Sequence, residues 1–277
     1  MKLKSSDYIP LIKSALNEDL KNTGDITSNA IFKDQEASFV LLSKDNGILC
    51  GLDIFSDTFY LTDKKIKLKF YFKDKNFIKY GDIIARINGK VSSILKGERT
   101  ALNFLSHLSG IATKTNKFVK RVKNKIEILD TRKTIPNMRI LQKYAVYCGG
   151  GTNHRMGLFD MVLIKDNHID AAGGITNAVN NVREKWDKKY KIEVETRNLE
   201  EVKEALLCKV DRIMLDNMSI NEMVKAVKLI NNETKIEVSG NINLKNIKKL
   251  LKLKIDYISI GELTHSSEAF DFSLKEE

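Results

Sequence analysis

The sequence is poor in cysteine, proline and tryptophan, and it has no long hydrophobic run. Its 277 residues include three cysteines, two prolines and one tryptophan. Cys50, Cys148 and Cys208 are odd in number and lack metal-ligand spacing, so we expect no disulfide framework and a reducing, cytoplasmic location. No stretch approaches the roughly 18 apolar residues of a membrane span. No apolar segment follows the charged N-terminal residues, so we expect neither a membrane protein nor a secreted one.

Several motifs for nucleotides, metals and nucleophiles are also absent. Neither a P-loop nor a GxGxxG sequence occurs, which disfavours P-loop ATP hydrolysis and Rossmann-type dinucleotide binding. His107, His154, His168 and His265 show no HxxxH or HxH spacing, so a metal site built from histidines is not expected. Cys148 lies near His154, but nothing obvious supplies the third, orienting group of a cysteine nucleophile.

The net charge of +11 does not by itself identify a partner. A basic chain can bind nucleic acid, an anionic membrane or a polyanionic small substrate, or it can simply carry a lysine-rich solvated surface. With 42% hydrophobic and 30% charged residues, the composition is that of a soluble globular protein. Nucleic-acid binding is disfavoured because aromatic residues make up only 8% of the chain and the informative cations follow predicted strands.

What the sequence does contain is a series of six short apolar runs, each ending in a polar or small residue. The ends recur at the spacing of one strand plus one helix and its loops, which indicates parallel strands joined by helices. In a parallel α/β barrel the carboxyl ends of the strands converge on one face, where active sites lie. The runs cover residues 126–130, 161–165, 192–195, 212–216, 236–240 and 257–261, and they should bring together Lys133, Lys165, Glu195, Asp216, Ser239 and Gly261.

The first hundred residues have a different pattern. An amphipathic helix is predicted over 8–20, followed by strands over 37–42, 47–50, 66–72 and 83–87, with a helix over 52–60. A long helix follows over 97–121. We therefore predict an N-terminal α+β domain over 1–105 and an α/β barrel over 106–265, with residues 266–277 a candidate to return to the first domain. Because no Gly/Ser-rich linker occurs, the two domains should pack tightly.

Two loops carry residues suited to anions. Thr131, Arg132 and Lys133 directly follow a predicted strand, and two cations with a hydroxyl suit a phosphate or a carboxylate. Three glycines precede His154 and Arg155, and consecutive glycines allow close approach of the backbone to a ligand. The alternatives are an exposed basic loop and a plain flexible loop.

The remaining strand ends are individually ambiguous. Lys165 should point into the barrel mouth, whereas His168 nearby is expected to be structural. Glu195 and Asp216 either neutralise neighbouring cations or hold ribose hydroxyls and Mg²⁺, which prefers a few carboxylates plus substrate phosphates. Ser239, Gly240 and Gly261 lie where the last strands of a barrel often form a phosphate site.

Taken in order, these segments resemble the quinolinate phosphoribosyltransferase family over nearly the whole chain. The resemblance implies an N-terminal α/β sandwich domain and an incomplete, about six-stranded α/β barrel of the type II phosphoribosyltransferase kind. It also implies a homodimer or a higher oligomer with a shared active site, into which Arg99 reaches from the partner subunit. The matching segments are 18–27, 97–104, 107–113, 130–136, 149–155, 164–168, 213–217, 237–240 and 257–261.

The implied activity is transfer of phosphoribosyl from 5-phosphoribosyl 1-pyrophosphate to quinolinate with decarboxylation, giving nicotinate mononucleotide for NAD biosynthesis. The implied cofactor is Mg²⁺, held directly or through substrate or water by Glu195 and Asp216, which with Lys133 and Lys165 form the expected catalytic set. Four further residues are expected to bind quinolinate: Arg99, Arg132, His154 and Arg155. Thr131 is expected to line the basic loop. The residues expected around the 5′-phosphate are Ser239, Gly240, Asn241, Ile260, Gly261, Glu262 and His265.

The sequence departs from the family pattern at a few positions. Asn241 stands where another glycine is usual, and Asn tolerates a positive φ better than most residues, so the turn should survive. Glu262 replaces a small residue, and we expect its carboxylate to point away from the phosphate. Asn137 replaces a glycine with little expected consequence, while Lys21 and Asn22 replace a glycine-containing turn.

Two rival interpretations remain. A paralogue of the same fold, the molybdenum-transport-associated phosphoribosyltransferase-like protein, is disfavoured by the complete set of basic residues for a dicarboxylate. A basic protein that binds nucleic acid should instead have its cations on one exposed face, among aromatic residues.

Overall fold

The computed structural model describes residues 1–123 and 125–277, which form two compact units. Unit 1 comprises residues 1–116, 134–150 and 263–277, and unit 2 comprises 117–133 and 151–262. The predicted boundary near residue 105 falls inside one continuous helix, α4 (Val91–Arg121). Among the described residues, no helix combines the length and apolar character required to cross a membrane.

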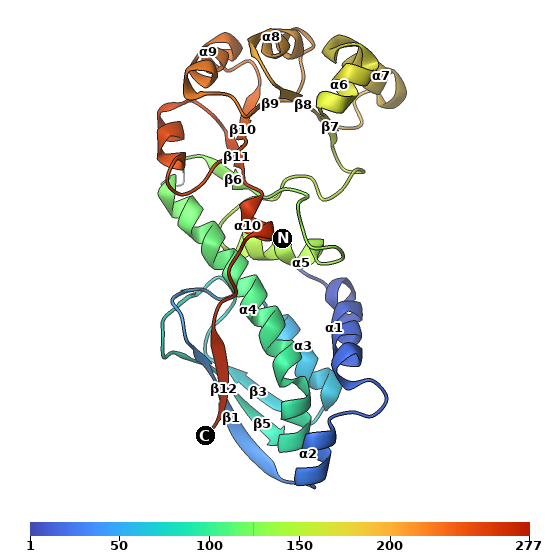
Figure 1. The fold of residues 1–277 in the computed structure, drawn as a ribbon, viewed down its shortest axis with the longest axis vertical. Helices are drawn as coiled ribbons and strands as arrows, with labels where there is room; N and C mark the ends of the chain where they lie inside the picture. Colours follow the sequence, from blue (N-terminus) through green and yellow to red (C-terminus); the bar gives the residue numbers. More distant parts are fainter. Residues whose placement is uncertain (124) are drawn as a thin grey trace. The chain divides into compact units, whose positions relative to one another are not determined.

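Unit 1 is built on a four-stranded antiparallel sheet with strand order β12-β1-β5-β3 (Figure 1). A separate pair, β2 and β4, forms a small antiparallel ladder. The strands are β1 (Glu36–Ser43), β2 (Gly47–Ile48), β3 (Lys67–Phe70), β4 (Phe77–Ile78), β5 (Ile83–Lys90) and β12 (Phe272–Glu276). The helices are α1 (Ser5–Leu20), α2 (Ile26–Ile31), α3 (Leu52–Thr62), α5 (Arg139–Cys148) and the larger part of α4.

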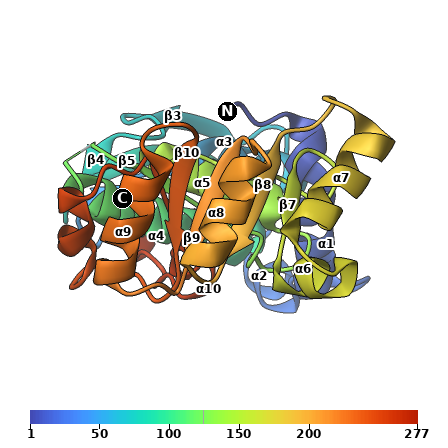
Figure 2. The same cartoon turned by 90° about the horizontal axis from the view of Figure 1, so that it is seen from above.

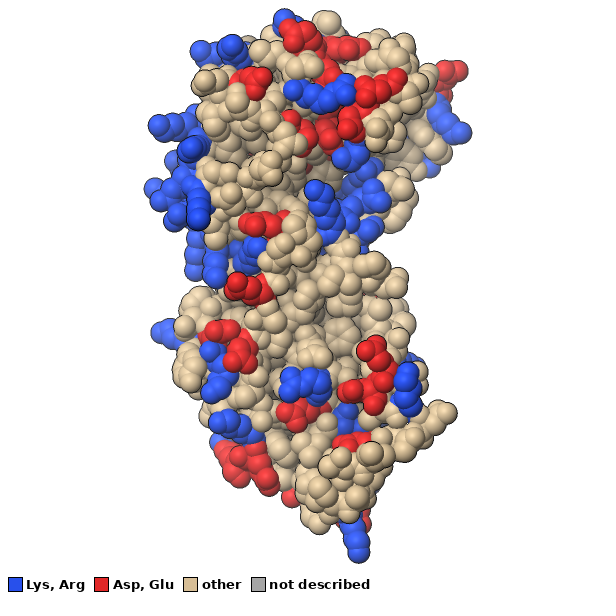
Figure 3. Space-filling view, in the orientation of Figure 1, with Lys and Arg blue, Asp and Glu red and all other residues tan. Residues whose placement is uncertain are grey.

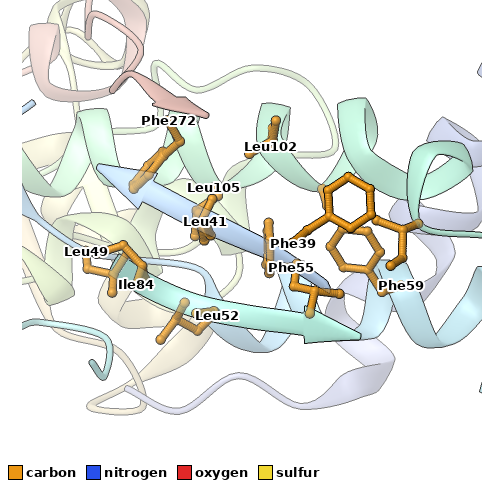
Figure 4. Close-up of a cluster of buried hydrophobic side chains, with 14 of the residues drawn as sticks. Phe39, Leu41, Leu49, Leu52, Phe55, Phe59, Ile84, Leu102, Leu105 and Phe272 are labelled. Atoms are coloured by element: carbon orange, nitrogen blue, oxygen red, sulfur yellow. The ribbon is translucent and has the colours of Figure 1, made fainter. Parts of the chain in front are cut away.

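The core of unit 1 is apolar and rich in aromatic rings (Figure 4). Phe55 and Phe59 on α3 are fully buried, and their rings meet edge to face with centroids 5.0 Å apart. Side chains from β1, α4 and β12 complete the cluster, including Phe39, Leu105 and Phe272. Burial of such rings outweighs the ordering of the chain because each removes a large apolar surface from water.

The C-terminal segment returns to the first sheet, as the sequence indicated it could. Residues of β12 pair antiparallel with β1, with Phe39 opposite Glu276 and Ser43 opposite Phe272. Phe270 and Phe272 also belong to the buried cluster. The last strand is therefore an integral part of the N-terminal sheet.

The long helix α4 begins six residues before the predicted start at Gly97. Val91 and Ile94 are buried and occupy the apolar stripe that continues through Leu105. The intervening Ser92 and Ser93 are weak helix formers, which conceals this first turn in the sequence. Tertiary burial therefore decides where the helix starts.

Unit 2 contains the predicted six parallel strands, in the order β6-β11-β10-β9-β8-β7. Figure 1 shows them on an arc, and Figure 2 shows α8 and α9 lying over one face of the sheet. The strands are β6 (Glu127–Leu129), β7 (Val162–Ile164), β8 (Ile192–Thr196), β9 (Arg212–Asp216), β10 (Lys235–Ser239) and β11 (Tyr257–Ser259). The helices are α6 (Asp166–Ala172), α7 (Ile175–Trp186), α8 (Leu199–Leu207), α9 (Ile220–Ile230), the 3₁₀ helix η1 (Ile247–Lys252) and the start of α10 (Glu262–His265).

The six-stranded arc confirms the incomplete barrel predicted from the sequence. β6 and β7 lie at the two ends of the strand order, so the sheet does not close through them in the described part of the chain. Beyond β6, the N–H of Thr152 donates to the carbonyl of Ile128 at 2.8 Å. All six strands point the same way, so their carboxyl ends lie along one edge.

Candidate active site

Lys165 and Glu195, predicted to meet at the carboxyl ends of the strands, form an ion pair. Lys165 directly follows β7, and Glu195 lies near the end of β8, the neighbouring strand. The Lys165 Nζ donates to the Glu195 Oε2 at 2.6 Å. The Glu195 side chain is 12% exposed, against 45% for Lys165, so the carboxylate is the buried partner and the ammonium faces outward.

Asp216 and Ser239 lie opposite each other at the ends of β9 and β10. The side chain of Asn217 donates to the Asp216 Oδ2 at 2.7 Å. Gly240 has φ +100, and a Cβ there would lie 2.2 Å from the Asn217 Oδ1, so no larger residue fits this turn unchanged. Asn241 has φ +50, which confirms that asparagine adopts the left-handed conformation expected at this position.

Asp130 joins the two predicted anion-binding loops. It is fully buried just after β6, and its carboxylate accepts the backbone N–H of His154 at 3.0 Å and the Asn153 side chain at 2.6 Å. The Thr131 Oγ1 accepts the N–H of Lys133 at 3.0 Å. A carboxylate that accepts such hydrogen bonds fixes the donor segment, so the Thr131–Lys133 loop and the His154-Arg155 segment are held together.

Two of the predicted quinolinate contacts are close enough to repel each other electrostatically. Arg155 is buried, and its Nη1 donates to the carbonyl of Met161 at 3.2 Å. Burial lowers the pKa of Arg155, and the positive charge of Arg132 lowers that pKa further. Two guanidinium groups in such an arrangement are suited to sharing an anion, because a bound negative charge relieves their repulsion.

Below these residues, the interior of the sheet contains a buried charged cluster that the sequence did not predict. Glu193 on β8 and Glu237 on β10 are fully buried. The His154 Nε2 lies 3.1 Å from the Glu193 Oε2 and 3.6 Å from the Glu237 Oε2. The Arg212 Nη1 lies 2.8 Å from the Glu237 Oε2 and 3.7 Å from the Glu193 Oε2. Burial raises the pKa of Glu193 and that of Glu237 to about 7 each.

The sequence did carry a signal for this cluster. Glu193 and Glu195 alternate with buried residues along β8, so both project to the same face of the strand. Glu237 has the same relation to Ser239 on β10. A charged residue in the middle of a buried apolar run is unusual enough to mark a site.

The remaining predicted residues fall in different places. The N–H of Ile260 donates to the carbonyl of Leu129 at 3.0 Å, and the Ile260 side chain is buried. Gly261 and Glu262 follow β11, and the expected direction of the Glu262 carboxylate stays a prediction. Arg99 on α4 and His265 on α10 are exposed and belong to unit 1.

His168 has the structural role expected of it. Its Nδ1 accepts the backbone N–H of Lys165 at 3.0 Å, at the first turn of α6. This contact fixes the main chain of Lys165 where the strand passes into the helix.

Two of the three cysteines, Cys50 and Cys148, form a cluster in unit 1 that their spacing does not reveal. Polar atoms of Cys50, Asp74 and Cys148 all lie within 4.8 Å of one another. The Asp74 carboxylate accepts the N–H groups of Gly51 and Leu52 and the Tyr144 hydroxyl, all at 2.9–3.1 Å. Its oxygens therefore already cap helix α3, which is a structural role.

Glu195 and Asp216 have the donor chemistry required for Mg²⁺. They lie on neighbouring strands, and Glu195 is opposite Met214, two residues before Asp216 on the same face of β9. Mg²⁺ is a hard ion that prefers carboxylate oxygens and keeps much of its coordination for water and phosphates. Two carboxylates with one lysine nearby fit such an ion when it arrives with a phosphorylated substrate.

Sequence comparison places the chain in a family. Residues 25–109 match the description "Quinolinate phosphoribosyl transferase, N-terminal domain", and residues 111–275 match the corresponding C-terminal domain. The chain belongs to the quinolinate phosphoribosyltransferase family. Together the two matches cover both the antiparallel sheet and the six-stranded parallel sheet.

Individual members of the quinolinate phosphoribosyltransferase family are similar over nearly the whole chain. The chloroplastic nicotinate-nucleotide pyrophosphorylase [carboxylating] of Arabidopsis thaliana is 42% identical over 288 residues, covering 97% of this chain and 82% of that one. The probable nicotinate-nucleotide pyrophosphorylase [carboxylating] of Bacillus subtilis is 39% identical over 268 residues, covering 95% and 92%. The solved nicotinate-nucleotide pyrophosphorylase of Francisella tularensis superposes with a TM-score of 0.96 at 41% identity, covering 100% of this chain and 98% of that one.

Proposed function

We propose that this protein transfers the phosphoribosyl group of 5-phosphoribosyl 1-pyrophosphate to quinolinate, in the step of NAD biosynthesis that releases CO₂ and pyrophosphate and gives nicotinate mononucleotide. The names of its relatives support this activity. The structural observation that carries the proposal is the convergence of Arg132 and Arg155, whose charges act on each other, in the same sheet unit as the Lys165–Glu195 pair. A dicarboxylate and a pyrophosphate both require such fixed positive groups.

In the proposed complex, the cationic residues hold the pyridine dicarboxylate. Arg132, Arg155 and Lys165 contact its two carboxylates, with His154 beside them, and Lys133 lies between the two substrates. Lys165 exchanges its ion pair with Glu195 for a substrate carboxylate. Glu195 is then released to accept hydrogen bonds from the ribose hydroxyls, together with Asp216.

The proposed 5′-phosphate site lies at the ends of β10 and β11. Ser239 offers a hydroxyl, and Gly240 with Asn241 forms a turn of two residues with positive φ, which exposes backbone N–H groups. Gly240 has φ +100, and an added Cβ would lie 2.2 Å from the Asn217 Oδ1, so both the conformation of this turn and the close approach of Asn217 require glycine. The segment from Ile260 to Glu262, with His265 after it, completes the proposed set.

Positioning and electrostatics supply most of the proposed catalysis. The pyridine nitrogen attacks C1 of the ribose as the C1–O bond to pyrophosphate breaks, and the departing pyrophosphate carries both electrons of that bond. The bond between the ring and the 2-carboxylate then breaks, CO₂ leaves, and the electron pair remains on the ring carbon beside the pyridinium nitrogen until that carbon takes a proton. Fixed cations stabilise the developing charges, so no protein nucleophile is needed.

Mg²⁺ would be held by Glu195 and Asp216, directly or through water or substrate. When bound, it neutralises pyrophosphate and makes it a better leaving group. The same carboxylates would orient the ribose hydroxyls.

The proposed active species is a homodimer in which Arg99 from one subunit completes the site of the other. Arg99 is exposed on α4, and its guanidinium is the predicted quinolinate contact that lies outside the strand ends. Sedimentation that finds only monomers at concentrations where the enzyme is active would contradict this arrangement.

The rival proposal of nucleic-acid binding finds little support in the surface charge. In the lower part of the face drawn in Figure 3, basic side chains are interleaved with acidic ones, whereas basic side chains predominate along the left edge of its upper part. Exposed lysines also take part in ion pairs, such as Lys235 with Asp256 at 2.6 Å. Part of the positive charge is therefore balanced locally, and none of these observations singles out a nucleic-acid surface.

The test is formation of nicotinate mononucleotide from quinolinate, 5-phosphoribosyl 1-pyrophosphate and Mg²⁺, with the variant Lys165→Gln beside the wild type. We expect the variant to lose about a hundredfold or more in kcat/KM, because a charged contact to the substrate is removed. Lys235→Gln is a matched control, since it breaks an ion pair of the same 2.6 Å length at the opposite end of the strands in the same sheet.

Equal losses in the two lysine variants would show that ion pairing, and not the site, governs activity. Absence of product from the wild type would refute the proposed function. Turnover of nicotinate in place of quinolinate would also refute it and would indicate a related enzyme of the same fold.

A further inference from the structure

The six-stranded sheet contains a buried charged cluster made of His154, Glu193, Glu237 and Arg212. Its two glutamates lie two residues before the predicted site residues at the carboxyl ends of β8 and β10. Glu193 precedes Glu195 by two residues, and Glu237 precedes Ser239 by two. Both glutamates have side chains with no exposed surface, and the His154 side chain is 6% exposed. Buried ionisable groups are costly, so their retention calls for a role.

The imidazole of His154 accepts a hydrogen bond at one nitrogen and lies beside a carboxylate at the other. Its Nδ1 accepts the backbone N–H of Arg155 at 2.7 Å, so Nδ1 carries a lone pair and the ring proton is on Nε2. The Nε2 faces the Glu193 Oε2 at 3.1 Å, closer than the Glu237 Oε2 at 3.6 Å. The ring therefore connects the Glu193 carboxylate to the main chain of Arg155.

The guanidinium group of Arg155 has a hydrogen bond of its own and is also influenced by the charge of Glu193. Its Nη1 donates to the carbonyl of Met161 at 3.2 Å. The negative charge of Glu193 opposes the fall in the Arg155 pKa that burial and Arg132 cause. Glu193 consequently acts on Arg155 twice, through the imidazole and through space.

Glu237 differs from Glu193 in its partner, although both are buried to the same extent. It lies 2.8 Å from the Arg212 guanidinium, whereas the Glu193 Oε2 lies 3.7 Å from it. Arg212 in turn lies over the ring of Tyr257, with its Cζ 4.1 Å from the ring centroid. By distance, Arg212 is therefore the nearer partner of Glu237, and His154 is the nearer partner of Glu193.

We propose that Glu193 is a positioning residue for quinolinate: its carboxylate faces the Nε2–H of His154 and fixes the orientation of that ring, and through it the place of Arg155, without touching the substrate. The inference rests on the proposed function for its substrate. It separates the two buried glutamates by role, since Glu237 belongs to the structural pair with Arg212.

The experiment compares Glu193→Leu, Glu193→Gln and the matched control Glu237→Gln. Leucine removes the carboxylate that faces the Nε2–H, whereas glutamine keeps an oxygen of the same reach in its amide group. We expect Glu193→Leu to raise the KM for quinolinate about tenfold or more, with the KM for 5-phosphoribosyl 1-pyrophosphate changed less than about twofold. Glu193→Gln should recover most of this loss, and Glu237→Gln should leave the quinolinate KM within about threefold of the wild type.

A rise of equal size in both KM values, or an equal rise in Glu237→Gln, would overturn the proposal and indicate general loosening of the sheet. The thermal midpoint of each variant is recorded so that KM changes are compared at similar stability. If Glu193→Leu does not fold, ¹⁵N NMR of histidine-labelled wild type decides the question. The signal that disappears in His154→Gln should belong to a neutral ring protonated on Nε2, and a ring protonated on Nδ1 overturns the proposal.

A bound metal ion is the other reading of this cluster, because one oxygen from each glutamate and one nitrogen of His154 lie within 4.8 Å of one another. Elemental analysis of the purified enzyme tests it. A stoichiometric ion whose removal by a chelator raises the quinolinate KM would overturn the positioning role. If the wild type does not turn over quinolinate at all, the proposed function fails, and the NMR measurement still tests the contact of His154 with Glu193.

Discussion

The two units of this protein have opposite interiors. Unit 1 encloses an apolar cluster of phenylalanine, leucine and isoleucine between an antiparallel sheet and the helices α3 and α4. Unit 2 has apolar contacts between its sheet and outer helices, but the inner face of the sheet holds Glu193, Glu237, His154 and Arg212. One interior is suited to stability, and the other contains charge directly below a proposed binding site.

The difference shows how the same chain divides its tasks. Apolar burial is non-directional and tolerates small movements, whereas a buried charge requires partners at defined distances. The cluster in unit 2 therefore costs stability but fixes geometry. In proteins, groups that position a substrate must be held within a fraction of an ångström, and ionic contacts in a closed interior provide this.

The largest expected effect is a loss of stability when the apolar core of unit 1 is disrupted. Phe55→Ala should lower the free energy of unfolding by about 3–5 kcal/mol, because it leaves a cavity in the core. The Phe55 ring is fully buried, and it meets Phe59 at 5.0 Å and Phe70 at 6.4 Å between centroids. Denaturant unfolding followed by circular dichroism measures the loss.

Phe77→Ala is the matched control for that experiment. Phe77 lies in the same unit but is 50% exposed, so its replacement should change stability by less than about 1 kcal/mol. Similar losses at the two positions would mean that the apolar cluster is not the source of stability in unit 1.

The next effect concerns the charged interior and depends on pH. The folded-state pKa values of Glu193 and Glu237, about 7, lie above their ordinary value of 4.5, so the folded protein holds protons that the unfolded chain has lost between these values. Stability from this source is fully present below pH 4.5 and is lost as the pH rises through 7. Each unit of pKa difference corresponds to about 1.4 kcal/mol per group, so a loss of a few kcal/mol is expected by pH 8.

Glu237→Gln tests the origin of this pH dependence, because glutamine has no proton to lose. The variant should show a clearly shallower fall in the free energy of unfolding between pH 5 and pH 8. An unchanged slope would assign the dependence to other groups. Replacing the exposed Glu200 by Gln provides a control, and its slope should match that of the wild type.

The smallest effect contrasts two glycines with positive φ, one in each unit. Gly81 has φ +87 and open space around it, so Gly81→Ala should cost about 1–2 kcal/mol from backbone strain alone. Gly240 has φ +100, and an added Cβ would lie 2.2 Å from the Asn217 Oδ1, so Gly240→Ala must also displace Asn217. Gly240→Ala should therefore raise the KM for 5-phosphoribosyl 1-pyrophosphate, whereas Gly81→Ala should leave it unchanged. Equal kinetics in the two variants would contradict the proposed phosphate site.

Much of this arrangement could be predicted from the sequence because strands and their ends follow local rules. Apolar runs that end in Lys165, Glu195 and Asp216 indicate parallel strands with polar tips, and the 2.6 Å contact of Lys165 with Glu195 follows from that pattern. Asn241 with its φ of +50 follows from the tolerance of asparagine for the left-handed region.

What could not be predicted depends on contacts between distant segments. Glu193 and Glu237 are separated by a complete strand and two helices, and only the sheet brings both against His154. The first turn of α4 was missed because the burial of Val91 and Ile94, and not local propensity, sets its start. The role of Arg99 requires a second subunit, which one sequence does not describe.

The pairing of β1 with β12 has a consequence for how the molecule is made on the ribosome. Phe39 lies opposite Glu276, so β1 cannot complete its ladder until β12 has emerged. The intervening chain, including all six parallel strands, is synthesised before that edge is covered. During synthesis one edge of β1 therefore remains open to other polypeptides until β12 pairs with it.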